Sequence, residues 1–340
     1  MKFLAALLAL HLAPVSPNAP NRQPQFATAG DMVALVFGSG DSIWLARSTD
    51  NGQTFPPPVK IGELPKLLLG RHRGPRVAIS GNTMLISAIS SAPGDLVVWR
   101  STDSGRTWTG PRAINDQPSA SREGLHAMAA DASGHVAAAW LDDRSGHGKR
   151  LYGAFSDDAG ATWSRNVQLY ESSSGSICEC CHPSLISLGG GEFEVMWRNS
   201  LNGNRDLYAM RLRNGQPAGP AEKQGLGSWA LNACPMDGGG IAVRNGVLAS
   251  AWRRDRDVYF AEAGKPEMKA GTGQDVALAA NIHGWYVAWS STSGVQMLMP
   301  HAAQPTILSP AGAFPTLIAT GDGAVLAAWE ENGAIATARF

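Results

Sequence analysis

The chain has 340 residues, and its 28 Lys and Arg are balanced by 28 Asp and Glu, so the net charge at neutral pH is zero. A chain without net charge has no long-range field to attract a polyanion or an anionic membrane, and nucleic acid is therefore not expected as a partner. Only 16% of the residues are charged, whereas the chain has 39 Gly, 21 Pro and 11 Trp. This composition favours many short strands joined by turns.

The first residues have the pattern of a secretory signal. Lys2 supplies a positive charge, and the run from Phe3 to Ala13 is apolar but too short to span a bilayer. The prolines that follow disfavour the alternative, a buried amphipathic helix. We predict a signal peptide over residues 1–19, cleaved near residues 16–19, and a secreted or periplasmic protein. No later segment reaches about 18 consecutive apolar residues, so no membrane span is expected.

A repeat runs through the rest of the chain: an apolar strand, a tight turn, a second apolar strand that mostly ends in an aromatic residue, and a third strand. Seven second strands end at Phe37, Ala88, Trp140, Trp197, Trp252, Trp289 and Trp329. In the third strands, four aromatic residues take matching places and are expected in the core: Trp44, Tyr152, Tyr208 and Tyr259.

The spacing of the repeat, roughly 40 to 55 residues, is that of a four-stranded propeller blade. We therefore predict one all-β domain over residues 20–340, a seven-bladed β-propeller of antiparallel blades. A six-bladed propeller is the alternative, if one short copy merges with its neighbour. Because the last copy ends at Phe340 on its third strand, we expect residues 18–23 to supply the missing outer strand.

Three turns between third and fourth strands share the pattern Ser-x-Asp-x-Gly-x-Thr followed by Trp or Phe, at residues 48–55, 101–108 and 156–163. The pattern resembles the Asp-box, or bacterial neuraminidase repeat, of the sialidase-like propeller superfamily. An aspartate in such a turn can accept backbone N–H bonds, and the glycine permits positive φ, so a structural role is expected. These structural residues are Asp50, Gly52, Asp103, Gly105, Asp158 and Gly160. The resemblance implies that they lie on the face opposite the sialidase active site.

The resemblance also implies a set of catalytic residues. Sialidases of this superfamily use three arginines to hold a carboxylate, a tyrosine nucleophile aided by a glutamate, and an aspartate acid–base. Candidates for the arginines are Arg73, Arg76, Arg198 and Arg253, and candidates for the acid and base are Glu123 and Asp237, which alternatively bond backbone amides. The chain lacks the family's early Arg-Ile-Pro phrase, and only Tyr170 and Tyr286 lie outside the repeat register. A full catalytic set is therefore not expected.

The loops that lead from one blade into the next open on one face of a propeller, so residues far apart in sequence converge there. All four cysteines lie in two consecutive loops of this kind. Three interpretations are open. The cysteines could form disulfides, most easily one bridge with two free thiols, or a soft-metal site for copper or zinc. The third is a thiol redox role. The candidate metal ligands are Cys178, Cys180, Cys181, His182, Cys234, His126 and His72, with Met236 as a thioether.

These patterns together predict an exported, monomeric, sialidase-like binding propeller with a Cys/His site at the channel mouth. Its ligand would be a small molecule, a glycan or a protein. The first alternative is an exo-sialidase or related glycoside hydrolase that acts on acidic sugars. The second is a scaffold that binds other proteins.

Overall fold

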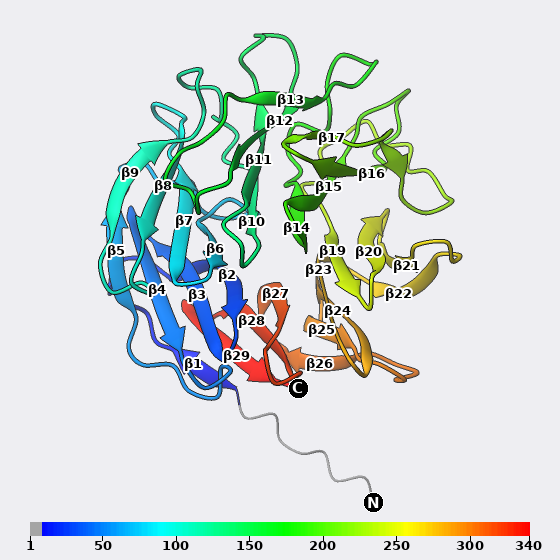
Figure 1. Ribbon diagram of the computed structural model, residues 1–340. Helices are drawn as coiled ribbons and strands as arrows, with labels where there is room; N and C mark the ends of the chain where they lie inside the picture. The colour runs from blue at the N-terminus through cyan, green and yellow to red at the C-terminus, as the bar shows by residue number, and fades with distance from the viewer. Residues whose placement is uncertain (1–8) are drawn as a thin grey trace, which may run out of the picture.

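The computed structural model describes residues 9–340 and contains seven antiparallel sheets arranged around a central channel (Figure 1). The predicted seven-bladed propeller is therefore confirmed. Residues 1–8 of the predicted signal peptide lie outside the described residues. Within residues 9–340, no helix has the length and apolarity needed to cross a bilayer.

In blades 1 to 6 the strands follow one another in the sheet in chain order, from the channel outward. Blade 1 contains β2 (Arg22–Ala29), β3 (Met32–Ser39), β4 (Ser42–Ser48) and β5 (Val59–Glu63). Blade 2 contains β6 (Arg76–Ser80), β7 (Thr83–Ile89), β8 (Leu96–Ser101) and β9 (Thr109–Ala113). Blade 3 contains β10 (His126–Ala130), β11 (Val136–Asp142), β12 (Arg150–Ser156) and β13 (Val167–Tyr170).

Blades 4 to 7 repeat this order with two differences: blade 4 has an added strand, and the outer strand of blade 7 comes from the N-terminal end of the described chain. Blade 4 contains β14 (Ser184–Gly189), β15 (Glu192–Arg198), β16 (Leu207–Arg213) and β17 (Gln216–Pro217), and β18 (Glu222–Lys223) also pairs with β16. Blade 5 contains β19 (Gly240–Arg244), β20 (Val247–Arg254), β21 (Asp257–Glu262) and β22 (Met268–Thr272). Blade 6 contains β23 (Gln274–Asn281), β24 (Gly284–Ser291), β25 (Gly294–Leu298) and β26 (Thr306–Ser309). Blade 7 contains β27 (Ala313–Ala319), β28 (Val325–Glu331), β29 (Ala334–Arg339) and β1 (Leu10–Leu12).

The second strand of each blade is buried on both faces, because the neighbouring blades cover it. Trp140, Trp197 and Trp329 at the ends of three of these strands have no exposed surface. The third-strand aromatic residues lie directly opposite such anchors, as in the pair formed by Trp197 and Tyr208. They are half-buried rather than fully inside the core, because they sit nearer the rim of the ring.

The three Ser-x-Asp-x-Gly-x-Thr turns have the same hydrogen bonds. In one of them, Asp103 Oδ1 accepts from the Thr107 backbone N at 2.8 Å, and Asp103 Oδ2 accepts from Thr107 Oγ1 at 2.7 Å. Gly105 has φ +78°, and its N donates to Ser101 Oγ at 2.8 Å. Ser104 N donates to Asn82 O in the turn between the first two strands of the same blade, so these turns lie at the end of the blade opposite the loops that lead into the next blade.

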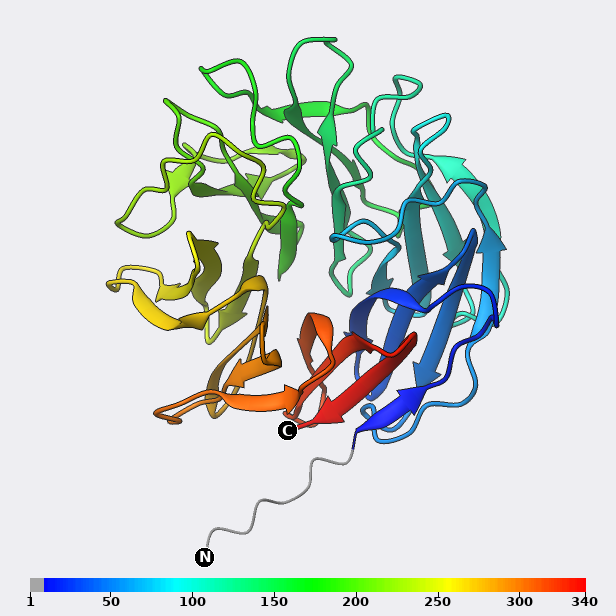
Figure 2. The same cartoon turned by 180° about the vertical axis from the view of Figure 1, so that it is seen from behind.

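The ring is closed by the two ends of the described chain. β1 pairs with β29, with Leu10 opposite Thr337 and Leu12 opposite Ile335, and Leu12 is buried (Figures 1 and 2). The buried Asn21 secures this segment, since its Nδ2 donates to Ala13 O at 2.9 Å. Closure by an N-terminal strand was expected, but its position at residues 18–23 was wrong, because residues 22–23 already belong to the inner strand β2. Cleavage near residues 16–19 would remove β1.

Candidate functional site

A cavity of about 530 Å³ fills the central channel, and the seven inner strands line it. Most of its wall is small and apolar, but His72, Arg76 and His182 stand at one end. This end is where the loops lead from each blade into the next, and we call it the mouth. It lies opposite the Ser-x-Asp-x-Gly-x-Thr turns, because strand direction alternates within each blade.

Side chains from four blades meet at the centre of the mouth. His72, from the loop leading into blade 2, lies within hydrogen-bonding distance of Asp275 in blade 6, with 2.9 Å between Nε2 and Oδ1. The same imidazole stacks on His182, which leads into blade 4, with 4.1 Å between ring centroids. Phe314 of blade 7 presents its ring edge-on at 5.6 Å. We call these four residues the mouth cluster.

Three inner strands begin with the same backbone irregularity. In β2, β23 and β27, two residues of the inner strand oppose one residue of the second strand. The first of the two residues is Gln23, Asp275 or Phe314, with φ of +57°, +58° and +54°. A β-bulge redirects a side chain out of the regular alternation, and left-handed backbone in residues other than glycine carries strain. The fold therefore holds three strained residues at equivalent places around the mouth.

Hydrogen bonds and burial determine the charge of the groups around the cluster. The backbone N and the side-chain Nε2 of Gln23 both donate to Glu330 Oε1, at 2.8 and 2.9 Å, and burial raises the pKa of Glu330. His182 Nδ1 accepts from Gly238 N at 3.2 Å, and Nε2 lies 3.2 Å from Gly239 O. Burial, reinforced by the nearby His72, holds the pKa of His182 well below its ordinary value, so His182 is a neutral imidazole whose two nitrogens are used by the backbone.

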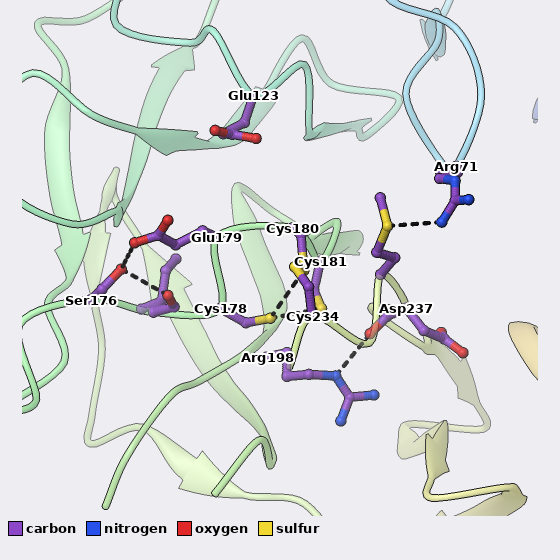
Figure 3. Close-up of a disulfide and its surroundings, with 12 residues drawn as sticks. Arg71, Glu123, Ser176, Cys178, Glu179, Cys180, Cys181, Arg198, Cys234 and Asp237 are labelled. Carbon is purple, nitrogen blue, oxygen red and sulfur yellow. Dashed lines mark hydrogen bonds between the residues drawn. A yellow bond between two sulfur atoms is a disulfide. The ribbon is translucent and has the colours of Figure 1, made fainter. Parts of the chain in front are cut away.

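The four cysteines form a sulfur cluster beside the mouth (Figure 3). A disulfide joins Cys180 to Cys234, with 6.2 Å between their Cα atoms, and so links the loops that lead into blades 4 and 5. Cys178 and Cys181 are free and buried, and their Sγ atoms lie 2.9 Å apart. The hydrogen bond from Cys181 lowers the pKa of Cys178 to about 7, whereas burial raises that of Cys181 well above its ordinary value.

Two candidate arginines are hydrogen-bonded to backbone carbonyl oxygens, including Arg76, which also lines the cavity. Arg198 donates to the carbonyl oxygens of Asp237, Arg205 and Arg253, at 2.8, 2.6 and 3.0 Å. Arg76 donates to the carbonyl oxygens of residues 72, 74 and 75, and burial lowers its pKa to about 10. Both guanidinium groups therefore fix the loops of the mouth. Neither is placed to hold a substrate carboxylate.

The remaining candidates are also engaged with protein groups. Arg73 donates to Glu123 O at 2.6 Å, and the Glu123 carboxylate forms ion pairs with Arg73 and Lys149. Asp237 is buried and accepts backbone N–H bonds from Gly239 and Asp275, at 3.2 and 2.9 Å. For these two acidic residues the geometry is that of structural groups, one in an ion-pair network and one bonded to amides.

The structure does not bring His126 to the mouth cluster. Its side chain is fully buried, with Nε2 2.9 Å from Ser87 Oγ on the second strand of the preceding blade, and burial lowers its pKa. The arginine Arg253, by contrast, lies over the ring of Trp229 at 5.2 Å, and its Nη1 donates to Gln274 at 3.1 Å.

No family model and no curated protein matches this chain. Several solved structures, however, match it along nearly its whole length. An α-L-arabinanase from Penicillium chrysogenum has a TM-score of 0.58 and 12% identity, over 98% of this chain and 97% of that one. The Hadza microbial sialidase Hz136 has a TM-score of 0.51 and 15% identity, over 94% of this chain and 65% of that one. The Aleuria aurantia lectin has a TM-score of 0.51 and 10% identity, over 96% of this chain and 92% of that one. These identities show a shared fold.

Sequence reasoning missed two of the four residues of the mouth cluster. It identified His72 and His182 but not Asp275 or Phe314, because the repeat was aligned on its second and third strands. An alignment on the first strands would place Gln23, Asp275 and Phe314 in one column, each opposite an aromatic residue that ends a second strand. The sequence signal for Asp275 and Phe314 was therefore their equivalent position at the start of the inner strands.

Proposed function

We propose that the protein is an exported carbohydrate-binding propeller of the sialidase-like type, which takes a hydroxyl-rich sugar at the mouth cluster. The observation that carries the proposal is the convergence of His72, Asp275 and Phe314 from three different blades, with His72 lining the end of the channel cavity. Bulges and left-handed backbone in residues other than glycine are concentrated at functional sites.

The chemistry of the cluster suits sugar hydroxyls. A carboxylate accepts hydrogen bonds from sugar hydroxyls, an imidazole can donate or accept one, and an aromatic ring offers an apolar face to the C–H side of a pyranose. Ligand pockets combine apolar side chains with a few oriented polar groups. The side chains around this cavity are mostly small or apolar, with His72, Arg76 and His182 at one end. The arabinanase and lectin with the same architecture add support by analogy of fold alone.

Hydrolysis of sialosides is the less favoured alternative. It needs guanidinium groups that face the substrate carboxylate, and Arg76 and Arg198 instead bind backbone carbonyls.

A glycan array followed by calorimetric titration tests this proposal. We expect a neutral oligosaccharide to bind, and Asp275→Asn or His72→Gln to weaken binding about tenfold or more, because each removes a hydrogen bond made by an ionisable group. Asp157→Asn, an exposed change near the opposite face, is the matched control and should have no effect.

Two outcomes would count against it. One is an array without any carbohydrate ligand, and the other is binding that both mouth variants leave unchanged. Turnover of a fluorogenic sialoside that is lost in Arg73→Ala or Arg253→Ala would favour the hydrolase instead.

A further inference from the structure

The sulfur cluster lies outside the mouth cluster, and carbohydrate binding makes no use of it. We propose that Cys178 and Cys181 bind one copper(I) ion through their two sulfur atoms. Figure 3 shows the two side chains facing each other, beside the disulfide between Cys180 and Cys234 and above the side chain of Arg198. The site is separate from the proposed sugar site.

The donor set is limited to two thiols. Three cysteine Sγ atoms lie within 4.8 Å of one another, but Cys180 is committed to its bridge with Cys234. The neighbouring His182 uses both ring nitrogens for backbone groups. Met236 packs against the cluster, yet its Sδ already accepts from Arg71 Nη1 at 3.0 Å.

Two thiolates select copper(I) over zinc. Zinc in structural sites almost always takes four ligands, and the cluster cannot supply four while the disulfide is intact. Copper(I) is a soft ion that prefers thiolate donors and accepts low coordination numbers. The two Sγ atoms are 2.9 Å apart in the metal-free protein, so the side chains must move apart to admit the ion between them. Cys178 and Cys181 are each only 1% exposed, so an ion held between them would be shielded from water and from oxidation.

The charge of the surroundings also fits this ion. Arg198 is 2% exposed, and its three hydrogen bonds go to uncharged carbonyl oxygens. Within residues 9–340 it forms no ion pair with a carboxylate. A buried cation without a counter-ion is costly. A copper(I) ion bound by two thiolates carries one negative charge and would balance it, and binding would release the thiol protons to solvent.

The test uses the full-length protein purified without reductant, so that the disulfide stays intact. A thiol count under denaturing conditions should give two free thiols. Anaerobic titration with copper(I) in competition with a chromogenic chelator should give one bound ion per chain, and zinc should not compete. Cys178→Ser and Cys181→Ser should each abolish stoichiometric binding, with circular dichroism checking that the variants fold.

The double variant Cys180→Ser with Cys234→Ser is the matched control, because it removes two sulfur atoms but leaves the proposed ligands. It should still bind one ion. The proposal is overturned if the isolated protein has all four thiols blocked, if it binds no copper(I), or if binding survives loss of Cys178 and Cys181. None of these results bears on sugar binding, which is measured separately.

Discussion

The bridge between Cys180 and Cys234 should be a major source of stability. The two residues are 54 positions apart, and a cross-link over a loop of about that length removes about 4 kcal/mol of chain entropy from the unfolded state at 25 °C. Replacing both residues by Ser should lower the free energy of unfolding by up to that amount. For a domain of this size the loss corresponds to roughly 6 °C in Tm.

Guanidinium unfolding followed by tryptophan fluorescence measures this effect, with the free thiols counted in parallel. The double variant is required, because a single Cys234→Ser change would leave Cys180 free to pair with Cys178, whose Sγ is 3.8 Å away. A loss of less than about 1 kcal/mol would refute the reasoning. It would mean that the loops leading into blades 4 and 5 are already held together by other contacts, such as those of Arg198.

Three further predictions follow from other parts of the ring. Hydrogen bonds, chiefly from Ser48 to Asp50 and from Thr162 to Asp158, hold the pKa of both aspartates at about 2. The stability that the two carboxylates contribute is therefore present above about pH 4 and lost towards pH 2. Changing both to Asn should flatten the acid limb of a Tm-versus-pH curve. Gly271→Ala would place a methyl group on the buried Trp289 ring and should cost about 1–3 kcal/mol in urea unfolding, and no loss would mean that the ring can move. A variant that starts after residue 16 should have a lower Tm than the chain with β1, because blade 7 loses its outer strand; an unchanged Tm would show that the ring does not need β1.

The fold could be predicted because its repeat contains large aromatic residues at regular positions. Six of the seven second strands end in an aromatic anchor, such as Trp140 or Trp329, and these residues recur at regular intervals. Ring geometry then brought Cys234 to the other cysteines across one blade boundary, as the structure has it. The direction of single side chains could not be predicted in this way. His126 points between two blades to Ser87, and Arg76 turns back to its own loop, because each satisfies a local backbone or hydroxyl group.

The pairing of β1 with β29 also governs when the protein can finish folding. Among the described strands β1 comes first and β29 last, so the seventh blade cannot be completed until β29 has left the ribosome. Contacts between distant parts of a sequence form slowly. The seventh blade is therefore expected to be the last part of the ring to form.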